Sequence, residues 1–235
     1  MKNKVLIGIN DFLPNSIGIS LLSLLNRIDY SRFDIDLIFV NSQQSIMTQI
    51  PKTVNIIFSP FSEKKLSFFD KLKIRKKYAF SLLYDVENPE LSGIIQIASK
   101  NNAVYIHKDY SSIYMVNDVY NNFYNSNKIF KFSKVLFANN ALKEFFLKKH
   151  PEFVNNSEVL NYIIDEQRII NLSKENISVK KPDHKTLLVF VGSLNDRSKN
   201  FSLMVNMMKN LMMINNKVCL WIIGDGPDLV NIKML

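Results

Sequence analysis

Cysteine, glycine and long apolar runs are all scarce in this chain of 235 residues. Cys219 is the only cysteine, so no disulfide can form within the chain and a small disulfide-stapled fold is excluded. No apolar run reaches the length of about eighteen residues that a membrane-spanning helix needs. The apolar stretch at residues 5–9 ends at Asn10 and is too short for the core of a signal peptide. These shortages predict a globular protein located in the cytoplasm.

Positive charge is present in excess. The chain has 30 Lys and Arg residues against 21 Asp and Glu, a net charge of +9. Such a charge suits nucleic acid, an anionic membrane surface or phosphate-bearing substrates. The sequence contains no zinc-ligand spacing, no RNA-binding aromatic signature and no basic-region heptads, so nucleic acid is not an expected partner.

The densest basic stretch covers residues 64–78, where cations interleave with Phe68, Phe69, Leu72 and Tyr78 at helical spacing. This pattern is typical of a helix that lies in a membrane interface. A solvated helix face with an ordinary apolar side in the core fits it equally well. The first interpretation predicts peripheral attachment to an anionic membrane surface at the inner face of the cell membrane.

Short apolar runs alternate with helical patterns along the chain, which is typical of a parallel sheet wrapped by helices. Leu21, Leu22, Leu25 and Ile28 share one helical face, and residues 141–147 form a second clear helix. In chain order, strands are expected at residues 5–9, 36–40, 55–59, 82–86, 103–107, 134–138 and 158–161. The predicted fold class is α/β.

A polar segment at residues 174–185, interrupted by Pro182, is the expected linker between two domains. Beyond it, strands are expected at residues 187–191 and 218–223, with a helix at residues 201–214 between them. This helix carries a methionine stripe that predicts a core-facing side, formed by Met204, Met207, Met208, Met212 and Met213. The predicted domains are residues 1–175 and residues 183–235, and the second is too small to be stable alone.

Three of the six glycines directly follow strands expected in the second domain: Gly192 after the first, Gly224 and Gly226 after the next. Ligands of parallel sheets bind at the carboxyl ends of strands, where backbone amides and helix N-termini attract phosphate. The same glycines could also serve only as turn residues. A dinucleotide-binding Rossmann enzyme ranks last among the alternatives, because this chain lacks the third glycine of that motif.

The residues around these glycines carry a family resemblance. Residues 192–201, Gly-Ser-Leu-Asn-Asp-Arg-Ser-Lys-Asn-Phe, resemble the donor-phosphate loop of the group 1 (family 4-like) glycosyltransferases, the retaining enzymes of GT-B fold. Gly224-Asp225-Gly226-Pro227 is similar to that family's next motif, beside the donor nucleotide. Lys199 keeps the family's lysine; Ser193 stands where the family has arginine, and Arg197 could supply that charge. The resemblance implies donor contacts from Gly192, Arg197, Lys199, Gly224, Gly226 and Pro227.

The first domain matches the same family less specifically. Residues 33–37 and 84–87 look like its second-strand and mid-domain signatures. Residues 104–110, Val-Tyr-Ile-His-Lys-Asp-Tyr, resemble a His-x-Asp-Tyr stretch of relatives that build surface polysaccharides. The family's first loop holds paired glycines, whereas only Gly18 is present here, and the resemblance makes it a donor contact.

Two residues of the His-x-Asp-Tyr stretch are the candidate catalytic groups. His107 closes an expected strand, so its imidazole would face the cleft, and by resemblance it contacts the acceptor or the transferred sugar. Asp109 could orient the imidazole or accept a hydrogen bond from it. The alternative for His107 is a hydrogen-bonded histidine at the sheet edge.

The resemblance implies transfer of a sugar, with retention of configuration, from a nucleotide sugar to a cell-surface glycan or lipid-linked acceptor. It implies neither a metal nor a cofactor, because fixed cations would stabilise the departing nucleoside diphosphate. The family's paired glutamates would fall beyond Leu235, so the expectation is a GT-B-like chain with an incomplete second Rossmann-like domain. The alternatives are a catalytically inactive truncated remnant and a nucleotide- or sugar-binding module that needs a separate C-terminal half.

Overall fold

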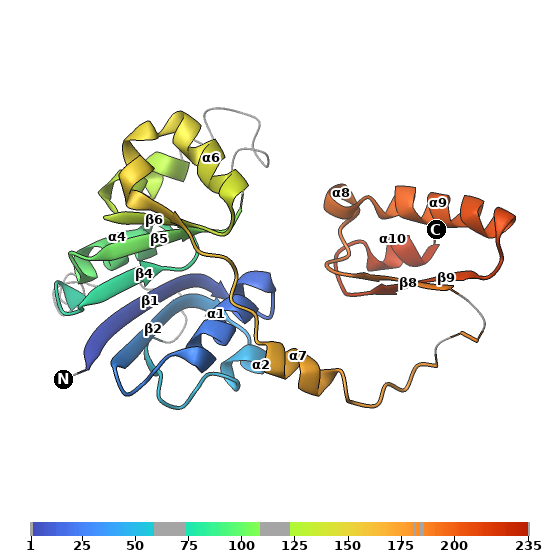
Figure 1. Ribbon diagram of the computed structural model, residues 1–235, viewed down its shortest axis with the longest axis horizontal. Helices are drawn as coiled ribbons and strands as arrows, with labels where there is room; N and C mark the ends of the chain where they lie inside the picture. Colours follow the sequence, from blue (N-terminus) through green and yellow to red (C-terminus); the bar gives the residue numbers. More distant parts are fainter. Residues whose placement is uncertain (1, 59–73, 109–122, 181, 184–185, 235) are drawn as a thin grey trace. The chain divides into compact units, whose positions relative to one another are not determined.

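The chain divides into two compact units, Met1–Ile169 and Ile170–Leu235 (Figure 1). The computed structural model describes residues 2–58, 74–108, 123–180, 182–183 and 186–234. The strands predicted at residues 5–9 and 187–191 lie in different sheets, one in each unit.

The first unit is built on a parallel sheet of seven strands in the order β3-β2-β1-β4-β5-β6-β7. The order reverses between β1 and β4, as in doubly wound α/β folds. Every strand predicted in this unit overlaps an observed one. The observed strands are β1 (Asn3–Phe12), β2 (Phe33–Ser42), β3 (Asn55–Phe58), β4 (Phe80–Leu83), β5 (Asn102–Ile106), β6 (Lys134–Phe137) and β7 (Ser157–Val159).

Helices cover both faces of this sheet, so its strands are apolar on both sides. One layer contains α1 (Ser16–Arg27) and the short α2 (Gln44–Met47), which pack with the β1 residues Val5, Ile7 and Ile9. The opposite layer contains α4 (Pro89–Ala98) and α6 (Asn140–Lys149), which pack with Leu6. Successive side chains of a strand point to opposite faces, which explains why a continuous apolar run such as residues 5–9 serves both layers.

Helix α4 was not predicted from the sequence, although its start signals are present. The side chain of Asn88 accepts hydrogen bonds from the backbone of Glu90 at 2.9 Å and Leu91 at 3.1 Å. Pro89 occupies the first turn, where its missing N–H costs nothing. Two 3₁₀ turns, η1 (Ile129–Lys131) and η2 (Pro151–Asn156), flank β6 and α6.

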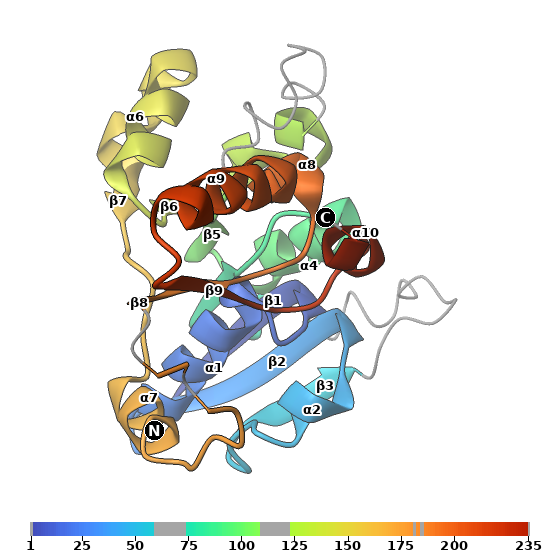
Figure 2. The same cartoon turned by 90° about the vertical axis from the view of Figure 1, so that its right-hand side faces the viewer.

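The second unit is a single strand–helix–strand arrangement with short helices added. The strands β8 (Thr186–Val191) and β9 (Val218–Ile223) pair in parallel, and α9 (Phe201–Ile214) runs alongside them (Figure 2). α8 (Asp196–Lys199) precedes α9, and α10 (Leu229–Met234) follows β9. α7 (Glu166–Leu172) spans the boundary between the two units.

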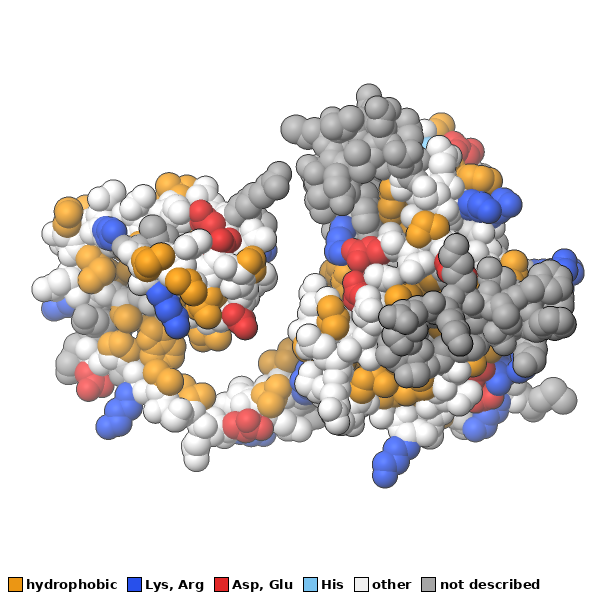
Figure 3. Space-filling model, turned by 180° about the vertical axis from the view of Figure 1, so that it is seen from behind, with side chains coloured by type: hydrophobic (Ala, Val, Ile, Leu, Met, Phe, Trp, Pro, Cys, Tyr) orange, Lys and Arg blue, Asp and Glu red, His pale blue; other side chains and the backbone are white. Residues whose placement is uncertain are grey.

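The prediction that the methionine stripe of α9 is core-facing is wrong for Met207, Met212 and Met213, whereas Met204 and Met208 are partly buried. Met207 is 62% exposed, Met212 48% and Met213 86%, whereas Phe201 is the one fully buried residue of this described helix. Two strands offer too narrow a surface to cover a helix of fourteen residues. Hydrophobic side chains therefore lie open on the surface of the second unit (Figure 3).

Candidate functional site

Ionisable and polar side chains gather at the carboxyl ends of the central strands of the first sheet. His107 and Lys108 follow β5, and Asp85 and Glu87 follow β4. Asp11 lies at the end of β1, on the other side of the point where the strand order reverses. Ligands of doubly wound sheets bind at this position, so these residues form the first candidate site.

His107 lies in a box of three tyrosine rings. The centroid of its imidazole is 3.9 Å from that of Tyr105, 4.9 Å from Tyr84 and 5.2 Å from Tyr162. The residue is only 7% exposed, and neither ring nitrogen has a hydrogen-bond partner of good geometry among the described residues. Buried polar atoms normally have such a partner, so His107 departs from the ordinary histidine of a sheet edge.

The environment keeps this imidazole uncharged at neutral pH. Burial lowers the pKa of His107 to about 4, and the positive charge of Lys108 acts in the same direction. The backbone of Tyr84 offsets only part of this shift. A neutral imidazole has one nitrogen that donates and one that accepts a hydrogen bond.

Two of the tyrosine hydroxyls have partners in the first unit. The Tyr84 hydroxyl lies 2.9 Å from the Ser20 hydroxyl on α1, and burial raises the pKa of Tyr84 to about 12. The Tyr105 hydroxyl donates to the carbonyl oxygen of Leu160, and burial raises its pKa as well. Both groups stay protonated, so they are hydrogen-bond donors throughout the physiological pH range.

The charged residues beside these three tyrosines were not singled out from the sequence. Lys108 forms an ion pair with Glu87. Burial lowers the pKa of Lys108, but the hydrogen bond to Glu87 and the charges of Asp85, Glu87 and Asp11 outweigh this effect and raise it. Asp11 in turn accepts a hydrogen bond from the Asn41 side chain at 2.6 Å. Each of these charged residues follows or ends a strand, and this position was the signal in the sequence that could have identified them. Their proximity to one another depends on the strand order, which the sequence did not show.

Of the other residues predicted for this site, Asp109 lies outside the described residues, and Gly18 has a structural role. Gly18 is in the first turn of α1, and its N–H donates to the Asn15 side chain at 2.9 Å. A Cβ at this position would lie 2.0 Å from the carbonyl oxygen of Leu13. Gly18 therefore allows the preceding loop to pass close to the helix.

In the second unit, the two glycine motifs predicted for the donor are brought together. They follow adjacent parallel strands, and their loops are joined by backbone hydrogen bonds. Leu194 N–H donates to the carbonyl oxygen of Asp225 at 2.9 Å, and Asp228 N–H donates to that of Leu194 at 3.1 Å. Gly192 N–H also donates to the carbonyl oxygen of Ile223 at 3.0 Å.

Contact between the two loops accounts for the glycines of the second motif. A Cβ on Gly224 would lie 1.9 Å from the carbonyl oxygen of Gly192, and its φ of +156° favours glycine. A Cβ on Gly226 would lie 2.3 Å from the carbonyl oxygen of Leu194. Pro227 continues this loop as a turn residue before α10. The loops need glycine for packing, whether or not they bind a ligand.

The N-terminus of α9, where a phosphate was expected, already receives a carboxylate. Asp196 accepts hydrogen bonds from the backbone N–H of Ser202 at 2.9 Å and from its hydroxyl at 2.8 Å. Both bonds lower the pKa of Asp196. A further anion at this helix end would have to compete with Asp196.

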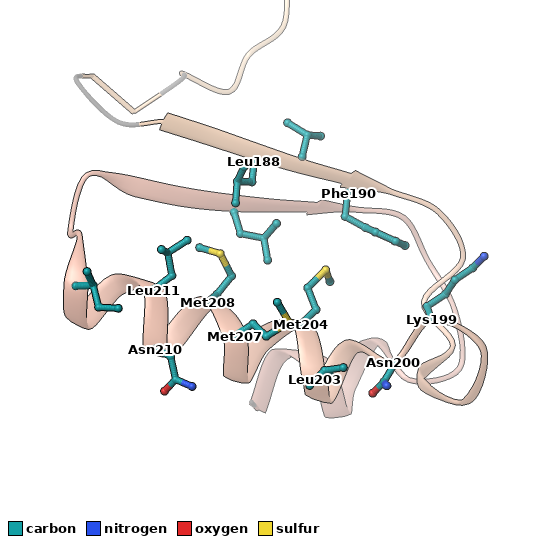
Figure 4. A pocket seen from close by; sticks show the side chains of 13 residues that line it. Leu188, Phe190, Lys199, Asn200, Leu203, Met204, Met207, Met208, Asn210 and Leu211 are labelled. Carbon is teal, nitrogen blue, oxygen red and sulfur yellow. The ribbon is translucent and has the colours of Figure 1, made fainter.

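Lys199 ends α8 and is exposed, so its ammonium group is accessible. It lies at the loop end of an apolar groove of about 750 Å³ between β8 and α9 (Figure 4). The groove is lined mainly by Leu188, Phe190, Leu203, Met204, Met207 and Leu211. The backbone of Arg197 belongs to α8, and its side chain lies outside what the structure describes.

Most of the basic stretch at residues 64–78 lies outside the described residues. Among the residues that the structure does describe, no helix is long and apolar enough to cross a membrane. In the same residues, no group of three or more His, Cys, Asp or Glu side chains is arranged to hold a metal ion.

Known proteins resemble this chain in structure but not detectably in sequence. No protein-family model matches it, and no curated protein matches at the significance threshold. Three solved structures, each 10% identical in sequence, align with it. Phytolacca americana UGT2 complexed with UDP-2-fluoro-glucose and pterostilbene aligns over 94% of this chain and 71% of its own, with a TM-score of 0.49.

The other two structures are more similar. A UDP-N-acetylglucosamine 2-epimerase aligns over 94% of this chain and 63% of its own, with a TM-score of 0.55. The N-terminal domain of Candida albicans trehalose-6-phosphate phosphatase aligns over 100% of this chain and 67% of its own, with a TM-score of 0.57. The chain thus spans about two thirds of the length of these structures, and its fold is α/β and GT-B-like, with Rossmann-like units.

Proposed function

We propose that this protein is a glycosyltransferase that moves a sugar from a nucleotide-sugar donor to a cell-surface glycan or lipid-linked acceptor. The observation that carries the proposal is His107, a buried neutral imidazole at the strand ends of the first sheet. Neither of its ring nitrogens has a hydrogen-bond partner of good geometry among the described residues. A ligand hydroxyl is a suitable partner for such a nitrogen.

The chemistry available to His107 fits sugar transfer. A neutral imidazole can accept a hydrogen bond from a sugar hydroxyl, and it can take a proton without first losing one. The proposed mechanism is retaining and independent of metal, as in the group 1 enzymes that the glycine motifs resemble. In that mechanism the leaving phosphate helps to deprotonate the acceptor, and His107 positions a hydroxyl of the acceptor or the transferred sugar.

The proposed donor site comprises the loops of the second unit. Lys199 offers an accessible cation beside the hydrogen-bonded loops at Gly192 and Gly224. One of the two more similar structures is named for an enzyme of a UDP-sugar, which supports a nucleotide sugar as the ligand. A cation there would stabilise the departing diphosphate.

A binding module without activity is the second candidate, and specific contacts favour it. Asp196 accepts a hydrogen bond from the Ser202 amide in the first turn of α9, and Gly224 and Gly226 are explained by loop packing. A site built in this way could bind a nucleotide weakly and perform no transfer.

Calorimetric titration with nucleoside diphosphates tests the donor site that both candidates share. We expect binding, and we expect Lys199→Ala to weaken it by about 1.5–3 kcal/mol through loss of a charge-assisted hydrogen bond. The matched control is Lys217→Ala, which removes another exposed lysine, just before β9 and at the end of the strand away from these loops, and should leave affinity unchanged. Equal effects of the two substitutions would refute the assigned phosphate loop.

A labelled-sugar transfer assay is the second arm of the test. Transfer that is lost in His107→Gln while nucleotide affinity is retained would support the glycosyltransferase. Nucleotide binding without any transfer would support the binding module. Absence of binding to every nucleoside diphosphate would overturn both candidates.

A further inference from the structure

Tyr162 stands out among the rings around His107, because it is the exposed one. Tyr84 and Tyr105 are each 1% exposed, whereas Tyr162 is 39% exposed. The Tyr162 ring stacks on the imidazole at an interplanar angle of 23°. Among the described residues, it is therefore the tyrosine that separates His107 from solvent.

The same tyrosine lines a cavity of about 220 Å³ between α1 and the segment after β7. Ser16, Ile19, Ser20 and Ser23 of α1 form one wall. The other wall is formed by Tyr162, Ile163, Ile164, Asp165, Arg168 and Ile169. Tyr162 is thus a shared boundary between the cavity and the imidazole.

The segment after β7 is held by hydrogen bonds at Leu160 but only by a long contact at Tyr162. Leu160 N–H donates to the carbonyl oxygen of Phe137 at 2.9 Å, and the Leu160 carbonyl accepts the Tyr105 hydroxyl. The Tyr162 hydroxyl reaches the carbonyl oxygen of His107 only at 3.5 Å, the outer limit of a hydrogen bond. Residues 160–165 have no regular secondary structure, so the ring can turn without breaking the anchor at Leu160.

We propose that Tyr162 is a gating and positioning residue for His107: its ring closes the imidazole off, and its displacement opens His107 to the cavity. The ligand class that suits the cavity is a small ring with hydroxyl groups, because serines and isoleucines line it together with the charged residues Asp165 and Arg168. Only this ligand assignment rests on the proposed function. The gate is a property of the unliganded protein.

Chemical labelling of His107 with diethyl pyrocarbonate, read out by mass spectrometry, tests the gate. In the full chain at pH 7 we expect slow labelling, because a buried ring reacts only during local opening. Tyr162→Ala should accelerate labelling by about tenfold or more, since opening is then no longer required. Tyr162→Phe keeps the ring and should label at the wild-type rate.

The matched control is Tyr124→Ala. The Tyr124 ring stacks on His150, at 4.0 Å between centroids and 10° between planes. This substitution should accelerate labelling of His150 and leave His107 unchanged. If Tyr162→Ala fails to fold, as judged by far-UV circular dichroism, Tyr162→Leu replaces it as a smaller apolar cover.

Titration of His107 by NMR gives a second, independent readout of how far Tyr162 keeps the imidazole from water. The ionisable groups facing the ring are Tyr84, Tyr105 and Tyr162, with Lys108 beside it. We expect a pKa near 4 in wild type and a rise toward 6.5 in Tyr162→Ala. A folded Tyr162→Ala with unchanged His107 labelling and pKa would overturn the gate. Neither measurement needs donor binding or turnover, so failure of the proposed function would leave this result interpretable.

Discussion

The two units of this chain are stabilised by different kinds of contact. The first unit has a seven-stranded sheet with buried side chains on both faces. In the described part of the second unit, the buried apolar side chains are Leu194, Phe201 and Val218. Hydrogen bonds and close backbone contacts between two loops supply much of its specific structure. Burial therefore dominates in the first unit and loop geometry in the second.

A matched pair of leucines provides the largest expected contrast. Leu21 on α1 is 0% exposed, and Leu203 on α9 is 53% exposed. Leu21→Ala should destabilise the first unit by about 2–5 kcal/mol through lost burial and a cavity. Leu203→Ala should cost under about 1 kcal/mol, as at surface positions.

Urea denaturation can follow the units separately. Trp221 is the only tryptophan of the chain and lies in β9, so its fluorescence reports on the second unit, while far-UV circular dichroism is dominated by the larger first unit. Equal costs for the two leucine substitutions would contradict the contrast in burial.

The pH dependence of stability should also differ between the units. Because the folded state lowers the pKa of His107 from 6.5 to about 4, it holds fewer protons than the unfolded state within this window. Stability of the first unit should therefore fall as the pH drops from 6.5 to 4, by about 3 kcal/mol from this residue. Above pH 6.5 the contribution is constant.

The comparison protein is His107→Phe, which keeps an aromatic ring and removes the titration. Its stability should depend less steeply on pH than that of wild type between pH 4 and 6.5. The transition followed at Trp221 should be the same in both proteins. Identical pH profiles of the first unit would show that His107 titrates normally.

A pair of glycine substitutions should have the smallest individual effects, and these effects should be opposite in sign. Gly226→Ala would force a Cβ against the backbone of Leu194, so we expect a loss of about 1–3 kcal/mol in the second unit. Gly93 lies in α4 with nothing within 4 Å of an added Cβ. Gly93→Ala should stabilise the first unit by about 0.5–1 kcal/mol, because alanine restricts the unfolded chain.

Thermal denaturation of both glycine variants measures this contrast. A neutral Gly226→Ala would mean that the two loops are free to separate. The result would then favour a ligand-binding role for the glycines over the packing role.

Local sequence patterns were sufficient to predict most of the secondary structure. Apolar runs marked the strands of both sheets, and the helix predicted at residues 201–214 has the bounds of α9. The pattern failed at α4, where the Asn88 cap and Pro89 were the decisive signals. It also failed for three of the five methionines of the α9 stripe, since a helical period shows that residues share a face but not that another element covers all of it.

In the candidate site, too, local features could be predicted from the sequence and contacts between distant residues could not. The place of His107 after a strand and of the glycines after β8 and β9 could be derived from the chain, because each is a local property of a strand end. The tyrosine box, the Lys108–Glu87 ion pair and the contact of Gly226 with Leu194 join residues distant in sequence. They depend on which strands become neighbours. Burial, and with it the low pKa of His107, is a property of the assembled sheet, since only packing from several elements removes the imidazole from water.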